Sequence, residues 1–248
     1  GFGYTYGGVV LDPTSPIQDL EAKVETPFLG VGRTFSLFGL TSQAFVALPY
    51  SWAQASGKVF GEDSSTTRSG FGDTRLRIST LLFGAPAITR EEFAKSAPQT
   101  VFGASLTVIA PTGQYFNNKL INLGTNRWSF KPELGLSYAI SNQWFIDLYA
   151  GAWFFTTNNS FYPGTSVRSQ EPLFSFQTHV SYNINPLMWA AIDFTYYTGG
   201  QTSVNDFYKN DNLNNSRLGA TFNFPISRSS AIKIAYSTGA IIRFGGNF

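Results

Sequence analysis

From Arg127 to Tyr138 the chain reads RWSFKPELGLSY, and its residues alternate between two kinds. The odd-numbered positions are polar or small, and the even-numbered positions are apolar. A period of two over this length predicts a β-strand with one polar and one apolar face, longer than the about five or six residues usual in soluble domains. Trp128 and Tyr138 bound the apolar face, as aromatic residues do where a strand crosses a bilayer. A strand of a soluble sandwich would alternate in the same way, so the rest of the chain has to decide.

The composition of the 248 residues is poor in the side chains that solvate a protein surface. Charged residues make up 13% of the chain, against roughly 25% in a typical soluble domain, whereas aromatic residues reach 17%. The mean hydropathy is −0.06, and no apolar run approaches the ~20 residues of a transmembrane helix. Low charge, many aromatic residues and flat hydropathy together are typical of a transmembrane β-barrel.

Single residue types argue against several classes of function. The chain has no cysteine, which excludes disulfides and cysteine metal ligands, and it has one histidine, which argues against zinc and haem sites. A net charge of +2 without a basic run argues against nucleic acid as a partner. We therefore expect no metal site, no cofactor and no catalytic residue.

The chain divides into strand-like segments separated by turn residues. The opening segment, Gly1–Leu11, is rich in glycine and tyrosine and ends at Asp12-Pro13. No linker or change of composition marks a second domain, so residues 1–248 are predicted to form a single antiparallel barrel, all-β in class. The later predicted strands lie at 22–38, 41–57, 69–83, 99–111, 126–139, 143–157, 171–183, 187–199, 215–225 and 231–244.

The connections between these segments alternate in length. Tight turns are predicted at 39–40, 141–142, 184–186 and 227–230, and longer polar links at 58–68, 112–125, 158–170 and 200–214. The link 84–98 stands at a turn position but is long, and within it Thr89–Lys95 resembles a short helix capped by Thr89. Short turns on one side and long loops on the other are typical of an outer-membrane barrel whose short side is periplasmic.

Counting the strands gives an odd number. Segment 22–38 runs down into the turn at 39–40, so Gly1–Leu11 must carry the chain up, and the eleventh strand, 231–244, then points to the long-loop side. Bacterial single-chain barrels have an even number of strands. We therefore predict twelve strands, with the last one missing from this sequence. The alternative is a ten-stranded barrel in which residues 1–20 fold inside as a plug.

Charged residues avoid the apolar class in the strands whose alternation is clear. A Lys or Arg at mid-bilayer costs about 2–4 kcal/mol, so the class that carries the charges is predicted to face the lumen. Cations outnumber acids in this class, which favours anions or carboxylated solutes, although a paired network filling a narrow barrel would look the same. The predicted channel-lining residues are Lys23, Glu25, Arg33, Asp73, Arg75, Arg77, Arg127, Lys131, Glu133, Asp147, Tyr149, Trp153, His179, Asp193, Tyr197, Arg217, Lys233 and Arg243.

Some inward positions are apolar, among them Phe45, Pro49, Ile109 and Phe155. They predict an amphipathic path that suits an apolar or aromatic solute, although each of them taken singly also fits plain packing. The link 112–125 is too apolar for a loop that extends into water, so we predict that it folds over or into the barrel as a constriction. The alternative is a loop that packs on its neighbours. The residues that indicate the constriction are Tyr115, Phe116, Leu120, Ile121 and Leu123.

The stretches LINLGTNRWSFKPE at 120–133 and GFGDTRLR at 70–77, with shorter ones at 195–200, 215–220 and 236–240, carry a resemblance to a known family. They resemble the outer-membrane channel proteins associated with the meta-pathway of phenol degradation. The resemblance covers nearly the whole chain. It implies a twelve-stranded outer-membrane channel linked to uptake of hydrophobic or aromatic compounds, whose final strand lies beyond the position of Phe248.

The leading functional hypothesis is a passive channel of the bacterial outer membrane, a monomer in contact with the lipid bilayer and lipopolysaccharide, whose solutes are small hydrophobic or aromatic molecules. A second hypothesis is a barrel enzyme of the lipase or protease kind, which needs a nucleophile beside a base. Its only histidine base would be His179, which falls in the inward class in mid-strand. A third is a structural or adhesive barrel whose loops form the binding surface.

Overall fold

The computed structural model describes residues 1–11, 17–88, 92, 99–227 and 230–246. The predicted helix Thr89–Lys95 lies outside the described residues, except for Glu92. Among the described residues, no helix is long and apolar enough to cross a membrane. The strands are β1 (Phe2–Val10), β2 (Ile17–Leu37), β3 (Leu40–Val59), β4 (Glu62–Phe71), β5 (Thr74–Phe83), β6 (Val101–Ala110), β7 (Ser129–Ala139), β8 (Trp144–Phe155), β9 (Asn158–Phe161), β10 (Ser166–Gln170), β11 (Leu173–Asn185), β12 (Met188–Gly199), β13 (Thr202–Val204), β14 (Phe207–Tyr208), β15 (Leu213–Pro225), β16 (Ala231–Ile241) and β17 (Gly245–Gly246).

Antiparallel pairing joins most of these strands into one nearly closed barrel of twelve strands. Neighbours follow the order β16-β15-β12-β11-β8-β7-β6-β5-β3-β2-β1-β17, and β4 also pairs with β3. β1 pairs with β2 from Phe2 to Val9, so this segment is a strand of the wall and not part of a plug. β17 holds the twelfth position with two residues, which pair with Val9 and Val10 of β1.

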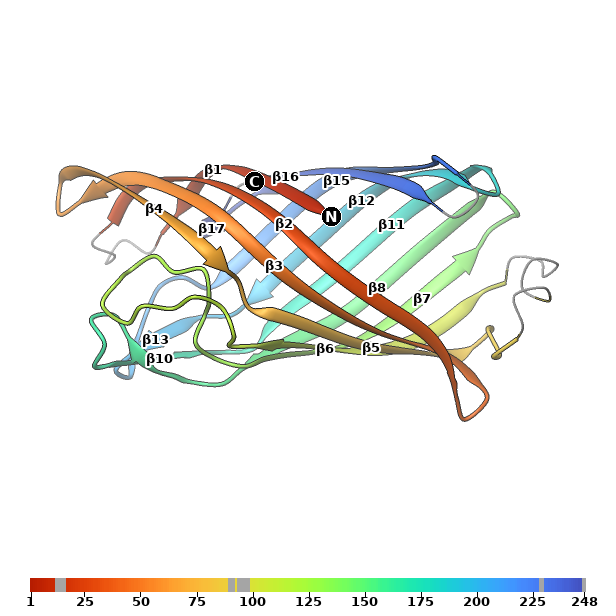
Figure 1. The fold of residues 1–248 in the computed structure, drawn as a ribbon, viewed down its shortest axis with the longest axis horizontal. Coiled ribbons are helices and arrows are strands. Elements are labelled where there is room, and N and C mark those ends of the chain that lie inside the picture. Colours follow the sequence, from red (N-terminus) through yellow and green to blue (C-terminus); the bar gives the residue numbers. More distant parts are fainter. Residues whose placement is uncertain (12–16, 89–91, 93–98, 228–229, 247–248) are drawn as a thin grey trace.

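The two ends of the barrel differ. Figure 1 shows the turns that join β2 to β3, β7 to β8 and β11 to β12 at one end, and the small sheet that contains β10 and β13 at the other. This second sheet has the order β14-β13-β10-β9 and forms within the predicted links 158–170 and 200–214. The arrangement matches the short periplasmic turns and long extracellular loops of outer-membrane barrels.

One predicted long loop is a hairpin instead. Residues 58–68 were expected to be a polar link, but β3 continues to Val59 and β4 begins at Glu62. The turn residues Phe60 and Gly61 have φ of 52° and 89°, and a two-residue turn with both φ positive fits the twist of paired strands. Figure 1 shows this hairpin reaching the same end as β10 and β13. Residues that extend past the bilayer meet water on the outside as well, so β4 lacks the alternation of a membrane strand.

The alternation predicted for the central stretch is confirmed from Ser129 on. In β7, Lys131 and Glu133 are 8% and 9% exposed, whereas Leu134 and Tyr138 are 52% and 51% exposed. Residues paired directly across neighbouring strands lie on the same face of a sheet. The inward class can therefore be followed around the wall, from Lys131 to its partner Thr107, then to Arg77 and Phe45.

In β2 the predicted faces were wrong. The inward Phe45 of β3 pairs with Gly32, so the neighbouring Arg33 faces outward. The register does not shift between Glu21 and Leu37, so Lys23 and Glu25 also belong to the outward class. They lie in the half of β2 nearer the loops, where Glu25 pairs with Trp52 and outward charges meet the interface or water. Arg33 stands near the other end of β2, where a long side chain can reach the interface.

An extra residue separates β4 from β5. Between the pairs Tyr50↔Phe71 and Ala47↔Arg75, β3 contains two residues, 48 and 49, whereas the opposite side contains three, 72 to 74. Such a bulge shifts the alternation by one position. The inward residues are even-numbered in β4, as Arg68 is, and odd-numbered in β5, as Arg77 is. Asp73 lies at this bulge.

Candidate functional site

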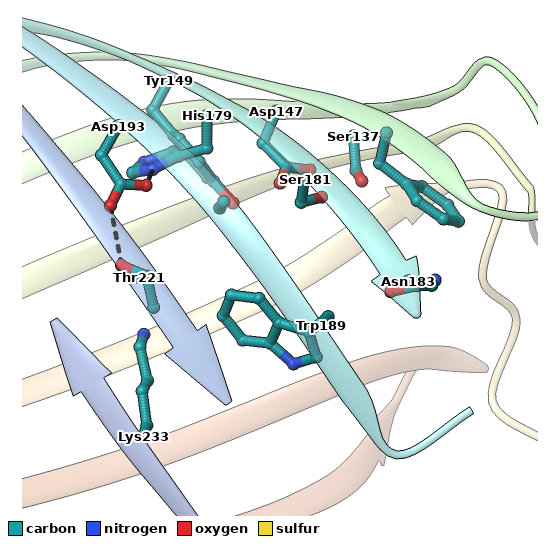
Figure 2. Close-up of a pocket in the computed structure, with 12 residues that line it drawn as sticks. Ser137, Asp147, Tyr149, His179, Ser181, Asn183, Trp189, Asp193, Thr221 and Lys233 are labelled. Carbon is teal, nitrogen blue, oxygen red and sulfur yellow. Dashed lines mark hydrogen bonds and ion pairs between the residues drawn. The ribbon is translucent and has the colours of Figure 1, made fainter. Parts of the chain in front are cut away.

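The lumen contains a cavity of about 420 Å³ between β7, β8, β11, β12, β15 and β16. Figure 2 shows side chains from all these strands around it, including Tyr149, Trp189 and Lys233. A second cavity of about 170 Å³ shares Ser137 and Tyr149 with the first and extends toward Arg77. The lumen thus offers aromatic surface and charged groups in one place. The residues lining the larger cavity are Ser137, Phe145, Asp147, Tyr149, His179, Ser181, Asn183, Trp189, Ala191, Asp193, Thr221 and Lys233.

His179 is held by a carboxylate inside this cavity. Its Nδ1 lies 2.5 Å from Oδ1 of Asp193, to which it pairs across β11 and β12. The hydroxyl of Thr221 donates to the other oxygen of Asp193 at 2.7 Å, the bond drawn as a dashed line in Figure 2. Thr221 is thus bonded to the carboxylate and not to the imidazole. A nucleophile activated by a base needs the hydroxyl on the base, so these three residues do not form such a triad.

A buried ion-pair network lies between β5 and β7. The carboxylate of Glu133 contacts Nζ of Lys131 on its own strand and lies 3.2 Å from Nη2 of Arg77. Lys131 also lies 5.7 Å from the centre of the Trp153 ring. One carboxylate thus contacts two cations. The predicted paired network therefore exists here, but it includes only three of the charged residues that were predicted to line the channel.

Other inward charges have no ionic partner in the part of the chain that the structure describes. Asp147 pairs across the strands with His179 and Ser137, but its side chain makes no hydrogen bond or ion pair with the described residues. Nζ of Lys233 lies 5.6 Å from the centre of the Trp189 ring, and Arg217 donates to Ser237 at 3.0 Å. Such groups remain available to a solute.

The segment 112–125 is fastened at both ends by Asp73. Oδ1 of this residue accepts a hydrogen bond from the Gly113 amide at 2.9 Å, and Oδ2 accepts two from Thr125. The amide of Gly124 closes the segment by donating to the Gln114 carbonyl at 2.9 Å. A Cβ on Gly124 would stand 2.8 Å from the backbone of Gly113 and 3.0 Å from Asp73, so the closure leaves no room for a larger residue.

The same segment packs on the inward face at the mouth. Arg68, inward on β4, donates through Nε to the Ile121 carbonyl at 3.2 Å. A Cβ on Gly70, two residues further along that face, would meet the Gln114 side chain at 2.9 Å. The Tyr115 hydroxyl donates to the Ser160 carbonyl of β9 at 3.1 Å. Leu120, Ile121 and Leu123 are half-buried, whereas Phe116 is 46% exposed.

Two arginines lie beneath the small outer sheet. Arg127 donates to Gln170 of β10 at 2.5 Å, its guanidinium lies 4.3 Å from the centre of the Phe155 ring, and its buried Nη1 has no hydrogen-bond partner. Burial lowers the pKa of Arg127 to about 10, an effect that Arg168 increases and Asp73 opposes. Burial also lowers the pKa of Arg168, opposed by Asp211 and Tyr115. Both groups remain cations at neutral pH.

The structure changes the predicted set of lining residues at several positions. Lys23, Glu25 and Arg33 belong to the outward class, and Asp73 is tied to the segment 112–125. Arg243 lies beyond β16, where its amide donates to Asn215. The registers place the remaining strand residues of the set on the inward face, including Arg75, Trp153 and Tyr197. Arg68 and Arg168 were not predicted to line the lumen, because the sequence analysis assigned both to loops. The inward aromatics Phe145 and Trp189 were also missed, although their odd-numbered positions belong to the inward class of their strands.

The fold and the lumen define the class of the protein, a transmembrane antiparallel β-barrel of the outer-membrane channel type. A solved structure described as "Crystal structure of the COG4313 outer membrane channel from Pseudomonas putida F1" is similar, with a TM-score of 0.81 and 18% identity over 99% of this chain and 88% of that chain. At this identity the likeness is one of fold. The chain belongs to the family described as "Putative MetA-pathway of phenol degradation", whose model matches residues 3–240. No curated protein is significantly similar to the chain.

Proposed function

We propose that the chain is an outer-membrane channel through which small hydrophobic or aromatic molecules pass by diffusion. The observation that carries this proposal is the combination, inside one barrel, of aromatic rings and charged groups without ionic partners around a cavity of about 420 Å³. Tyr149 and Trp189 offer apolar contact to a ring, while Asp147 and Lys233 offer hydrogen bonds to its polar substituents. The name of the family, with its reference to phenol degradation, supports the same class of solute.

The segment 112–125 is the constriction of this channel in our proposal. Its contacts with Arg68 and Gly70 are on the inward face of β4, and Tyr115 reaches β9 of the outer sheet. A segment fixed between these two places at the mouth narrows the entrance without needing to move. Its half-buried leucine and isoleucine side chains give the narrowed entrance an apolar surface.

Single-channel recording in planar bilayers tests both statements. The chain is expected to give discrete conductance steps in KCl, and added benzoate is expected to reduce them. Deletion of 115–123 is expected to raise the conductance and to abolish its dependence on added benzoate. Asn118→Ala, at an exposed position of the same segment, is the control and should change neither property. Unchanged conductance after the deletion would contradict the constriction. Bilayers that contain folded protein but show no conductance would contradict the open channel.

The proposed setting is the bacterial outer membrane, with lipid around the outward apolar class and lipopolysaccharide near the loops. We also propose that the barrel acts as a monomer. Light scattering of the detergent-solubilised chain, corrected for bound detergent, is expected to give the mass of one chain. A mass of two or three chains would overturn the monomer.

Hydrolysis at His179 is the alternative from another class, and the bonding of Thr221 to Asp193 instead of His179 speaks against it. We propose that the chain has no hydrolytic activity. Lipase and protease assays on the folded chain should show no turnover above that of empty detergent micelles. Turnover that His179→Ala removes while the barrel stays folded would establish the enzyme instead.

A further inference from the structure

Two guanidinium groups at the mouth share one face of the outer sheet. Arg168 and Gln170 stand two positions apart on β10, and side chains at such positions lie on the same side of a strand. Arg127 is hydrogen-bonded to Gln170, so its guanidinium lies beside the face that Arg168 occupies. Asn158, the partner of Arg168 across β9 and β10, donates to the Tyr115 hydroxyl and the Thr125 carbonyl. This face therefore looks onto the segment 112–125.

Neither arginine has its hydrogen-bonding capacity filled within the described residues. Nη1 of Arg127 is buried without a partner. The Arg168 side chain makes no hydrogen bond or ion pair with the residues that the structure describes, and its guanidinium lies 5.2 Å from the centre of the Phe161 ring. A buried donor without a partner costs about 1–3 kcal/mol, more when it is charged. The charge of Arg168 also repels that of Arg127, so a bound anion would both satisfy the buried donor of Arg127 and offset the repulsion.

The geometry points to a binding site for the carboxylate of a small organic acid between Arg127 and Arg168. A planar guanidinium matches the two oxygens of a carboxylate, and the rings of Phe155 and Phe161 beside the two arginines offer apolar contact to the remainder of the molecule. Asp73 and Asp211 act on the pair at longer range. Because these two acids offset positive charge near the site, a monoanion is expected to bind better than an anion of higher charge such as phosphate. The biological purpose of the site, capture of an acid before passage, rests on the proposed channel.

Calorimetric titration of the folded full chain in detergent tests this site without reference to conductance. The probes are sodium benzoate, neutral benzyl alcohol and inorganic phosphate. Benzoate is expected to bind, and phosphate is expected to bind more weakly. Any binding of benzyl alcohol is expected to be the same in the parent chain and in the arginine variants. Arg127→Gln and Arg168→Gln are each expected to weaken benzoate binding by about ten-fold, the loss of one charge-assisted contact. Arg33→Gln, on the outward face, is the matched control and should bind like the unaltered chain.

The variants separate binding from folding. The Arg168 side chain has no hydrogen-bond partner to lose among the described residues, so Arg168→Gln should keep the band shift of a folded barrel in unheated gels even if Arg127→Gln does not. Arg168→Lys keeps the charge but not the planar fork, and an affinity between those of the parent and Arg168→Gln is expected. Equal benzoate affinity in Arg168→Gln and the parent would overturn the site, as would the absence of benzoate binding to the parent at millimolar concentration.

Bilayer recordings distinguish failure of the site from failure of the channel. Conductance whose block by benzoate is the same in Arg168→Gln and the parent would overturn the site and leave the channel intact. Arginine-dependent binding in the calorimeter together with silent bilayers would support the site and overturn the channel.

Discussion

Asp73 holds Thr125 by two hydrogen bonds to a single carboxylate oxygen, one from the backbone amide at 2.8 Å and one from the hydroxyl at 2.7 Å. The other oxygen holds Gly113. One side chain on the barrel wall thus fixes the beginning and the end of a segment 52 residues away from it in sequence at Thr125. The position of the proposed constriction depends on this residue more than on any contact at the tip.

Asp73→Ala is expected to release the segment 112–125. It removes three hydrogen bonds to a carboxylate, each worth about 1.5–3 kcal/mol in favourable settings. We expect larger and noisier single-channel currents and faster cleavage within 112–125 by added protease. Asp63→Ala, an exposed acid of β4, is the control and should behave like the parent. Protease resistance equal to the parent's would show that the tip contacts alone hold the segment.

Gly124→Ala is expected to have the same effect by a different cause. The added Cβ would meet the backbone of Gly113 at 2.8 Å, which cannot shift without breaking the closure at Asp73. Gly3→Ala is the matched control, because its Cβ would meet only a carbonyl oxygen at 3.8 Å. Conductance should rise in the first variant and stay constant in the second. Parent-like currents in Gly124→Ala would mean that the closure adapts.

Glu133→Gln is expected to weaken the barrel and to change its selectivity. Breaking a buried ion pair by removing one partner typically costs about 3–5 kcal/mol, and Lys131 and Arg77 would lose their shared carboxylate. The midpoint of urea unfolding should fall, and the reversal potential in a KCl gradient should shift toward anions. Glu62→Gln, at the tip of the β3–β4 hairpin, is the control. A shift in potential without any loss of stability would indicate that water or a rearranged side chain replaces the carboxylate.

Leu134→Arg tests the assignment of the outward face. Leu134 lies in the middle of β7 and is 52% exposed outside the barrel, where arginine costs about 2–4 kcal/mol in a bilayer. Unfolding by urea in vesicles should show this loss. Phe60→Arg, at the hairpin tip, should change stability by no more than about 0.5 kcal/mol. Equal effects of the two substitutions would contradict the position of the membrane.

The barrel itself could be predicted because lipid and lumen impose opposite demands on alternate residues. The central strand shows this directly, with Lys131 and Glu133 inside and Leu134 and Tyr138 outside. The strand count followed from the lengths of the connections, and β1 is a wall strand as that count required. The inward position of His179, Tyr149 and Trp153 followed from parity alone.

Sequence reasoning failed where the chain leaves the bilayer. In β2 both classes contain polar and apolar residues, so Lys23 and Glu25 gave no reliable sign of their face. In β4 both faces meet water, and its serines and threonines looked like a loop. Arg168 could not be found because the link 158–170 looked like a polar loop, whereas it forms the hairpin β9–β10, in which Arg168 pairs with Asn158.

Because of the extra residue at Asp73, the number of residues between β4 and β5 decides which of their side chains face inward. Because even-numbered residues face inward before the bulge and odd-numbered residues after it, removing one residue from 72–74 would place either Arg68 or Arg77 and its neighbours on the opposite side of the wall. Where it reverses β5, such a deletion would expose Arg75 and Arg77 to lipid, although every remaining residue is unchanged. At this bulge the number of residues decides the faces of β4 and β5, independently of the hydrogen bonds that the Asp73 side chain makes.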